Sequence, residues 1–298
     1  MTVTTNNTVL TGSIEDRLQA VNEFMVRCLE ETPLGFLSPY AHCLLGSGKM
    51  LRSRLLFRVG AVSGAAEQTL VHAAAAAEMV HSASLLHDDV IDGGMLRRGA
   101  PAFWLEKGVS GAILLGDMLL FKALDVMCQV EQSRLAPLLV RLTGEVCQAE
   151  AEQELIFRGR EIDWEECVRI ARSKTGALFA FAAHAAGGPD AAVSAALQEA
   201  GYLIGTAYQL ADDVLDAKGD EQKADKTLGT DSARNKNTVM RFLSMGVDPT
   251  AYVDGLCRSA RRQLNEWPEV QAGWDVYMKQ DFLPAVQHHL EPSGETAD

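Results

Sequence analysis

The chain consists of long, predominantly apolar segments separated by short polar breaks, and the long segments carry almost no proline. No proline lies between Pro39 and Pro101, and only Pro137 lies between Pro101 and Pro189. Because proline breaks helix interiors, and because these segments are rich in Ala, Leu, Glu and Gln, they are predicted to be helical. Strict apolar–polar alternation with Val and Ile is missing, so no strand is expected. We predict an all-α protein of roughly ten helices in a single domain over residues 1–298, with loose ends at about 1–12 and 291–298.

Two of the apolar segments carry a stripe of polar residues. In the segment 70–92, polar residues recur at spacings of three, four and seven: Glu78, His81, Asp88 and Asp92. The segment 202–216 has a similar stripe, made of Tyr202, Gln209, Asp212, Asp213 and Asp216. Residues at these spacings share one face of a helix. Carboxylates that face an apolar core are costly unless they are paired or bind a cation, so the stripes predict a metal site or a wet cavity.

Both stripes contain the pattern D-D-x-x-D, at residues 88–92 and again at 212–216. Magnesium takes one or two carboxylates and completes its shell with water and substrate phosphate. Two such helices facing each other would hold a diphosphate through bound Mg²⁺. One motif alone would be interpreted as a solvated acidic turn, but two motifs in apolar helices favour a functional site. The candidate ligands are Asp88, Asp89, Asp92, Asp212, Asp213 and Asp216.

Composition narrows the class of protein. The formal net charge is −13, which argues against broad nucleic-acid binding and against electrostatic docking on anionic lipid. No stretch reaches the roughly 18 apolar residues of a membrane span, so no stable membrane insertion is expected. The first twelve residues lack the basic start and apolar run of a signal peptide, and no two of the six cysteines are spaced as C-x-x-C. A reduced, cytoplasmic protein is the simplest interpretation.

A metal-bound diphosphate also needs cationic donors, and several basic residues stand close to the acidic motifs. They are Lys49, Arg52, Arg97, Arg98, Lys174, Lys226 and Lys236. Arginine offers a planar fork for phosphate oxygens and lysine a mobile point charge. Each of these residues taken singly is more often a surface charge, so their order around the two acidic motifs carries the argument.

This order of motifs resembles the trans-prenyl diphosphate synthases over about residues 46–238, and in particular the bacterial geranylgeranyl to octaprenyl diphosphate synthases. The matching motifs are HSASLLHDDVID at 81–92, RRG at 97–99, GD at 116–117, KT at 174–175 and YQLADD at 208–213. The resemblance implies an isoprenoid-synthase-type helical bundle around a central apolar cavity, and a homodimer. It also implies an enzyme that joins isopentenyl diphosphate to an allylic diphosphate by ionisation, condensation and elimination.

The resemblance further implies two substrate sites. The allylic diphosphate would be bound through three Mg²⁺ ions, with Asp88, Asp92 and Asp212 as ligands and Asp89, Asp213 and Asp216 supporting them. The side chains facing this diphosphate would be Arg97, Lys174, Thr175, Gln209, Lys226 and Lys236. Catalysis would depend on Asp88, Asp92, Lys174, Asp212 and Lys226. Isopentenyl diphosphate would lie against Lys49, Arg52, His81 and Arg98.

The sequence departs from the pattern of this family at two places. Ser53 stands where these enzymes usually have a proline, in the motif SGKMLRS at 47–53. Thr230 replaces a lysine of the loop that follows the second acidic motif.

The size of the residues before Asp88 bears on the length of the product. One turn below this aspartate are Ala83 and Ser84, where the shorter-chain enzymes of the family often have an aromatic ring. Further down lies Val80, followed by alanines. A product of C20 or longer is therefore expected. Two alternatives stay open: the alanines serve only close helix packing, or the floor comes from a facing helix with Leu119, Leu120, Phe121 and Leu124.

Two other functions fit part of the pattern. A class I terpene cyclase would also ionise a diphosphate with magnesium, but it would not need the second diphosphate site of Lys49, Arg52 and Arg98. A non-catalytic partner subunit of a heteromeric synthase would usually lack one of the acidic motifs, and both are present here.

Overall fold

The computed structural model describes residues 12–40, 45–46, 48–130, 134–160, 162–218 and 248–290, without the side chains of 38–40, 216–218 and 290. The polar stretch that contains Lys226, Thr230 and Lys236 lies outside the described residues, as do both expected loose ends except Gly12. In the described part, the chain is almost entirely helical, which confirms the predicted all-α class.

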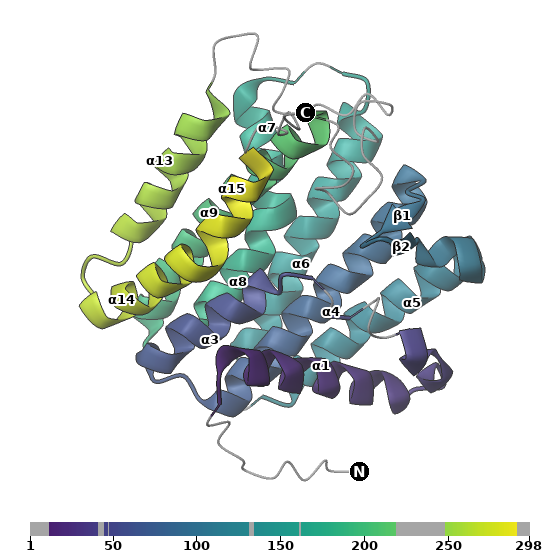
Figure 1. Ribbon diagram of the computed structural model, residues 1–298, viewed down its shortest axis with the longest axis horizontal. Helices are drawn as coiled ribbons and strands as arrows, with labels where there is room; N and C mark the ends of the chain where they lie inside the picture. Colours follow the sequence, from purple (N-terminus) through teal and green to yellow (C-terminus); the bar gives the residue numbers. More distant parts are fainter. Residues whose placement is uncertain are drawn as a thin grey trace, which may run out of the picture.

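The first half of the chain forms the helices that carry the first acidic motif. They are α1 (Ile14–Glu30), the short 3₁₀ helix η1 (Gly35–Tyr40), α3 (Leu51–Ser63), α4 (Glu67–Asp92), α5 (Phe103–Cys128) and α6 (Leu135–Glu152). Figure 1 shows α1 running across the other helices at the bottom of the view. It begins with a capping box in which the Ser13 hydroxyl accepts from the backbone N–H of Asp16 and the Asp16 carboxylate accepts from the backbone N–H of Ser13.

The second half returns over the first. It consists of the π-helical turn η2 (Gln153–Phe157), α7 (Trp164–Ala171), the π-helical turn η3 (Arg172–Gly176), α8 (Ala177–Ala186) and α9 (Ala191–Lys218). The C-terminal part is α13 (Pro249–Arg262), α14 (Pro268–Tyr277), the π-helical turn η4 (Met278–Phe282) and α15 (Leu283–Leu290). In Figure 1 these last helices cover the side formed by α9 and α3.

Helix α4 lies at the centre of the bundle and packs against α1, α3, α5 and α8. The five alanines from Ala73 to Ala77 are fully buried, because a helix surrounded on several sides needs small side chains wherever neighbours approach closely. The buried apolar side chains of the described residues form one contiguous cluster that includes residues from α1 to α15. The acidic motif at the C-terminal end of α4 thus stands on a rigid, deeply packed support.

The expectation of no strand is wrong at one place. Two strands of two residues each, β1 (Leu96–Arg97) and β2 (Ala100–Pro101), pair antiparallel just after α4. The central residues of the turn, Arg98 and Gly99, have φ of 54° and 72°. Positive φ at both positions is typical of a tight hairpin turn that suits the twist of its strands. Strands of two residues are too short for an alternation of apolar and polar residues, so the sequence pattern does not predict this hairpin.

Candidate functional site

The residues predicted to bind isopentenyl diphosphate come from three separate elements. Lys49 lies two residues before the start of α3 and Arg52 lies in the first turn of that helix. His81 lies on α4, and Arg98 lies in the turn of the hairpin. A methyl group at Gly48 would lie 2.8 Å from Nη2 of Arg98, so the hairpin guanidinium rests against the segment before α3. The structure therefore brings the hairpin after α4 against the segment before α3, although the two are far apart in the sequence.

His81 experiences several positive charges. Burial, together with the charges of Arg52, Arg98 and Arg97, holds the pKa of its imidazole well below the usual 6.5. The ring is therefore neutral at physiological pH and can act both as a hydrogen-bond donor and as an acceptor. Burial is the main cause of this shift, and the three arginines that add to it surround the ring with positive charge, which suits an anionic ligand.

Arg52 is surrounded by aromatic rings. Its guanidinium carbon lies 4.7 Å from the centre of the Phe179 ring, within the range of cation–π attraction. Burial lowers the pKa of Arg52, while the negative charge of Glu78 and the nearby tyrosines Tyr208 and Tyr277 act in the opposite direction. The group stays charged because arginine is the most basic side chain.

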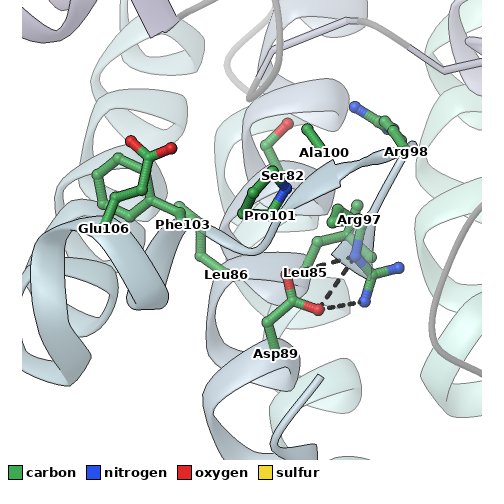
Figure 2. A pocket seen from close by; sticks show the side chains of 10 residues that line it. All are labelled: Ser82, Leu85, Leu86, Asp89, Arg97, Arg98, Ala100, Pro101, Phe103 and Glu106. Atoms are coloured by element: carbon green, nitrogen blue, oxygen red, sulfur yellow. Dashed lines mark hydrogen bonds and ion pairs between the residues drawn. The ribbon is translucent and has the colours of Figure 1, made fainter. Parts of the chain in front are cut away.

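The first acidic motif ends α4. Asp88 and Asp92 are half-buried, whereas Asp89 is buried and pairs with Arg97 through Nη2–Oδ1 and Nε–Oδ1 distances of 2.5 and 3.1 Å. Figure 2 shows this ion pair, with Arg98 pointing to a different side. The family resemblance predicts Arg97 to face the allylic diphosphate, whereas in the structure its guanidinium pairs with the buried carboxylate of Asp89. Asp89 and Arg97 thereby fix the hairpin to the end of α4.

The second acidic motif ends α9. Asp212 and Asp213 are half-buried, and the side chain of Asp216 is not described. Gln209 donates from Nε2 to Oδ1 of Asp213 over 2.8 Å, and its Oε1 accepts from the Thr175 hydroxyl over 2.5 Å. These three predicted residues are therefore joined in one hydrogen-bonded chain that links η3 to α9.

Lys174 lies in the π-helical turn η3, next to Thr175. Its Nζ lies 2.8 Å from Oε1 of Glu150 and 3.3 Å from Oε1 of Gln153, both on the facing segment of α6 and η2. The turn approaches α9 closely because both sides are glycines: a methyl group at Gly205 would lie 2.5 Å from the Cα of Gly176. The extra residue of the π turn and this close crossing together set the direction of Lys174 and Thr175.

His289 is a site residue that sequence analysis missed. It lies near the end of α15 and is buried, with its ring 5.1 Å from that of Tyr208. Its Nε2 is 3.4 Å from Nζ of Lys49, and its Nδ1 is 3.9 Å from Oδ1 of Asp212. One imidazole thus lies between a residue assigned to isopentenyl diphosphate and a residue assigned to magnesium. The only sequence signal is a His-His pair in an otherwise ordinary terminal helix.

The carboxylates suit a metal that arrives together with its substrate. Among the described side chains, no group of three or more acidic, histidine or cysteine residues converges closely enough to hold a metal ion by itself. Each motif instead presents half-buried aspartates, which is the donor type that Mg²⁺ prefers, and Mg²⁺ commonly completes its shell with water and phosphate oxygens. The residues present therefore fit magnesium bound with a diphosphate.

The residues assigned to product length lie where the predicted helix would place them. Val80 and Ala83 are buried, and the half-buried Ser84 donates its hydroxyl to the carbonyl of His81 over 2.8 Å. On the facing helix α5, Leu119 is buried, but Phe121 is 73% exposed. Phe121 therefore points away from the bundle and is not part of a floor beneath the site. The predicted central apolar cavity stays a prediction.

A small cavity of about 80 Å³ lies behind the first acidic motif. Figure 2 shows its lining, in which side chains of α4, of the hairpin and of the start of α5 meet, both apolar and polar; it includes the Asp89–Arg97 pair, Arg98 and Glu106. The cavity shares Asp89, Arg97 and Arg98 with the candidate site and borders that site on the side of α5.

In the described part of the chain, none of the helices has the length and hydropathy needed to cross a bilayer.

Comparison with known proteins gives the family context. The family model described as Polyprenyl synthetase matches residues 35–266. Farnesyl diphosphate synthase of Geobacillus stearothermophilus is 32% identical over 248 residues, which cover 78% of this chain and 84% of that protein. Octaprenyl diphosphate synthase of Haemophilus influenzae is 32% identical over 227 residues, which cover 74% of this chain and 68% of that protein.

A solved structure shares both the fold and part of the sequence. The polyprenyl synthase of Caulobacter crescentus, crystallised with calcium and isoprenyl diphosphate, is 28% identical and superposes with a TM-score of 0.71. The match covers 94% of this chain and 92% of that one.

Proposed function

The chain belongs to the polyprenyl synthetase family, and on this premise we propose that it condenses isopentenyl diphosphate with an allylic diphosphate to give a trans-polyprenyl diphosphate. The observation that supports this most is that the candidate residues form two chemically different groups. One is a pair of acidic motifs suited to a metal-bound diphosphate, and the other consists of the basic residues Lys49, Arg52 and Arg98 with the neutral ring of His81.

Departure of the allylic diphosphate is the difficult step, because negative charge accumulates on the leaving group. Bound Mg²⁺, three ions by the family resemblance, would neutralise that charge. Asp88, Asp92 and Asp212 would hold the metal, supported by Asp89, Asp213 and Asp216, and Lys174 would contribute a further positive charge. The proposal assigns Lys226 and Lys236 to the same diphosphate. A calcium complex of one relative and a magnesium complex of another, the geranyltransferase of Helicobacter pylori, support the use of a divalent cation.

The second diphosphate must be oriented so that its double bond meets the allylic cation. Arg52 and Arg98 would bind the phosphate oxygens of isopentenyl diphosphate, and the neutral ring of His81 would add a hydrogen bond without competing for a proton. His289 would keep Lys49 near this site. Water must be excluded, because it would capture the cation. A proton is then lost, and the released diphosphate is a base that could accept it.

The product is proposed to be C20 or longer. The small side chains of Ala83 and Ser84, one turn below Asp88, leave room for a growing tail beside α4, with Val80 at the next level. The relatives range from farnesyl to octaprenyl diphosphate synthases, so they are compatible with this length without fixing it.

The protein is also proposed to act as a homodimer in the cytoplasm. Large apolar side chains are exposed on α5 and on the adjacent α6, among them Leu114 at 64%, Phe121 at 73% and Val140 at 55%. Exposed apolar groups in neighbouring positions are typical of an interface. The described cysteines are all free thiols, which fits a reducing compartment.

Incubation with isopentenyl diphosphate, Mg²⁺ and allylic primers of increasing length tests the proposal. Elongated diphosphate products support the synthase. A cyclised hydrocarbon formed from the primer alone would indicate a terpene cyclase. Absence of turnover by the folded protein with every primer would indicate the non-catalytic partner subunit.

A further inference from the structure

Arg52 differs from the other arginines of its own helix. Arg54 and Arg58 both pair with Asp281, at Nη1–Oδ1 and Nε–Oδ2 distances of 3.2 and 3.0 Å. Arg52 forms no hydrogen bond or ion pair with any residue in the described part of the chain, and its Nε is buried without a hydrogen-bond partner. Its donors are thus available to a ligand, while those of its neighbours are occupied.

A guanidinium whose Nε is buried nevertheless needs a compensating negative charge. The acidic group that acts on Arg52 is Glu78, which lies on α4 and is only 4% exposed. A direct ion pair between the two would satisfy both residues, but it would also occupy the donors of Arg52. The structure shows no such pair. The carboxylate acts on the guanidinium through space without contacting it.

Ser53 explains where the carboxylate is held. The fully buried Ser53 hydroxyl donates to Oε1 of Glu78 over 2.7 Å. Ser53 follows Arg52 directly on α3, so the two side chains point to different sides of the helix. Ser53 also stands where the enzymes that this sequence resembles usually have a proline, which has no hydroxyl to donate.

We infer that Ser53 and Glu78 are positioning residues for Arg52: the serine holds the carboxylate away from the guanidinium, so that Arg52 keeps its charge compensation and its free donors for the diphosphate of isopentenyl diphosphate. This inference rests on the proposed function, since it takes isopentenyl diphosphate as the ligand of Arg52. It adds two residues to the site that touch no substrate themselves.

The test is a pair of variants with opposite effects. Ser53→Ala releases the Glu78 carboxylate, which should then pair with Arg52 and raise KM for isopentenyl diphosphate about tenfold, with KM for the primer little changed. Adding Glu78→Gln to Ser53→Ala should restore KM toward the wild-type value, because a neutral amide competes weakly for a guanidinium. A merely structural role for Ser53 would make the double variant no better than the single one.

Ser63→Ala is the matched control. It removes another hydroxyl from the same helix, one that donates to the carbonyl of Ala186, far along α3 from Arg52. It should lower the melting temperature without changing either KM. If Ser53→Ala does not fold, Ser53→Cys gives the same comparison with a weak donor in place of the hydroxyl.

Calorimetric titration with isopentenyl diphosphate separates this inference from the proposed function. If Arg52→Ala binds this ligand as tightly as the wild type, both the site assignment and the inference fail. If Arg52→Ala weakens binding but Ser53→Ala does not, or if Glu78→Gln fails to reverse the loss, only the inference is overturned. Weaker binding by Ser53→Ala that is reversed in the double variant supports it, even for a protein that shows no turnover.

Discussion

At the scale of single residues, the acidic motifs carry the clearest expectation. Asp88→Ala or Asp212→Ala removes one proposed ligand of the Mg²⁺ that would neutralise the leaving diphosphate. Turnover should fall by about two orders of magnitude or more, because such a loss typically costs several kcal/mol of transition-state stabilisation. Steady-state rates at saturating substrate and Mg²⁺ measure the effect, with circular dichroism to verify the fold.

Asp275→Ala is the control for these variants. Asp275 is an exposed carboxylate of α14 that pairs with Arg261 at the surface, so its removal should leave turnover unchanged. Near-normal turnover by a folded Asp88 or Asp212 variant would contradict the assignment of the metal ligands.

A second expectation at this scale concerns the path of the growing tail. Ala83→Phe places a ring one turn below Asp88, and the product should shorten by one or more five-carbon units if the tail passes there. Ala83 is fully buried, so the larger ring also carries a packing cost of about 1–3 kcal/mol. Ser84→Phe, at a half-buried position, is the milder companion. An unchanged product distribution from both active variants would show that the tail runs elsewhere.

Candidate residues that can be predicted from the sequence have partners nearby in the sequence, whereas those that cannot have partners far away along the chain. The pairs Asp88–Asp92 and Asp212–Asp213 can be recognised in the sequence, because each lies within one motif and helix geometry fixes the relative positions of its members. His289 meets Lys49 across 240 positions of sequence, and no local pattern encodes that contact. The Asp89–Arg97 pair was missed for a related reason: it depends on how the chain turns after α4.

At the scale of elements, the geometry of the hairpin turn after α4 can be tested by substitution of its glycine. Gly99 has φ of 72°, a conformation that side chains with a Cβ rarely adopt. Gly99→Ala should destabilise the turn by about 1 kcal/mol and displace Arg98, so that KM for isopentenyl diphosphate rises more than KM for the primer. Steady-state kinetics with each substrate varied in turn measures the difference.

The matched control is Gly64→Ala at the C-terminal end of α3. Gly64 has φ of 77°, and a methyl group there would meet no atom within 4 Å, so the backbone penalty is similar and no site residue moves. It should lower stability by a comparable amount and leave both KM values unchanged. A selective rise in KM for isopentenyl diphosphate in this control, or none in Gly99→Ala, would contradict the role given to the hairpin.

Long elements were predictable from the sequence and short ones were not. Helices such as α4 and α9 follow from proline-free apolar segments with polar stripes at helical spacing. The two-residue strands are too short to show a periodic pattern in the sequence. The π-helical turn η3 differs from a regular helix by a single wider turn, and it lies where Gly176 packs against Gly205, far away in the sequence. These short elements are the ones that direct Arg98, Lys174 and Thr175.

At the scale of the whole molecule, the exposed apolar side chains of α5 predict self-association. Phe121→Asp places a charge in the proposed interface and should shift the protein from dimer toward monomer. Sedimentation velocity over a range of concentrations measures this shift. Val276→Asp, at an apolar residue of α14 that is 40% exposed on another helix, is the control and should leave the dimer intact. A wild-type protein that is monomeric at all concentrations would contradict the proposed homodimer.

The central claim is that one site ionises an allylic diphosphate in the presence of a second, separately bound diphosphate. The most direct measurement is the release of inorganic diphosphate with the primer alone, with isopentenyl diphosphate alone and with both, each with Mg²⁺ and with excess chelator. We expect release only when both substrates and Mg²⁺ are present, with one diphosphate released for each isopentenyl diphosphate consumed. Equal release from the primer alone, or release that persists in chelator, would contradict the account.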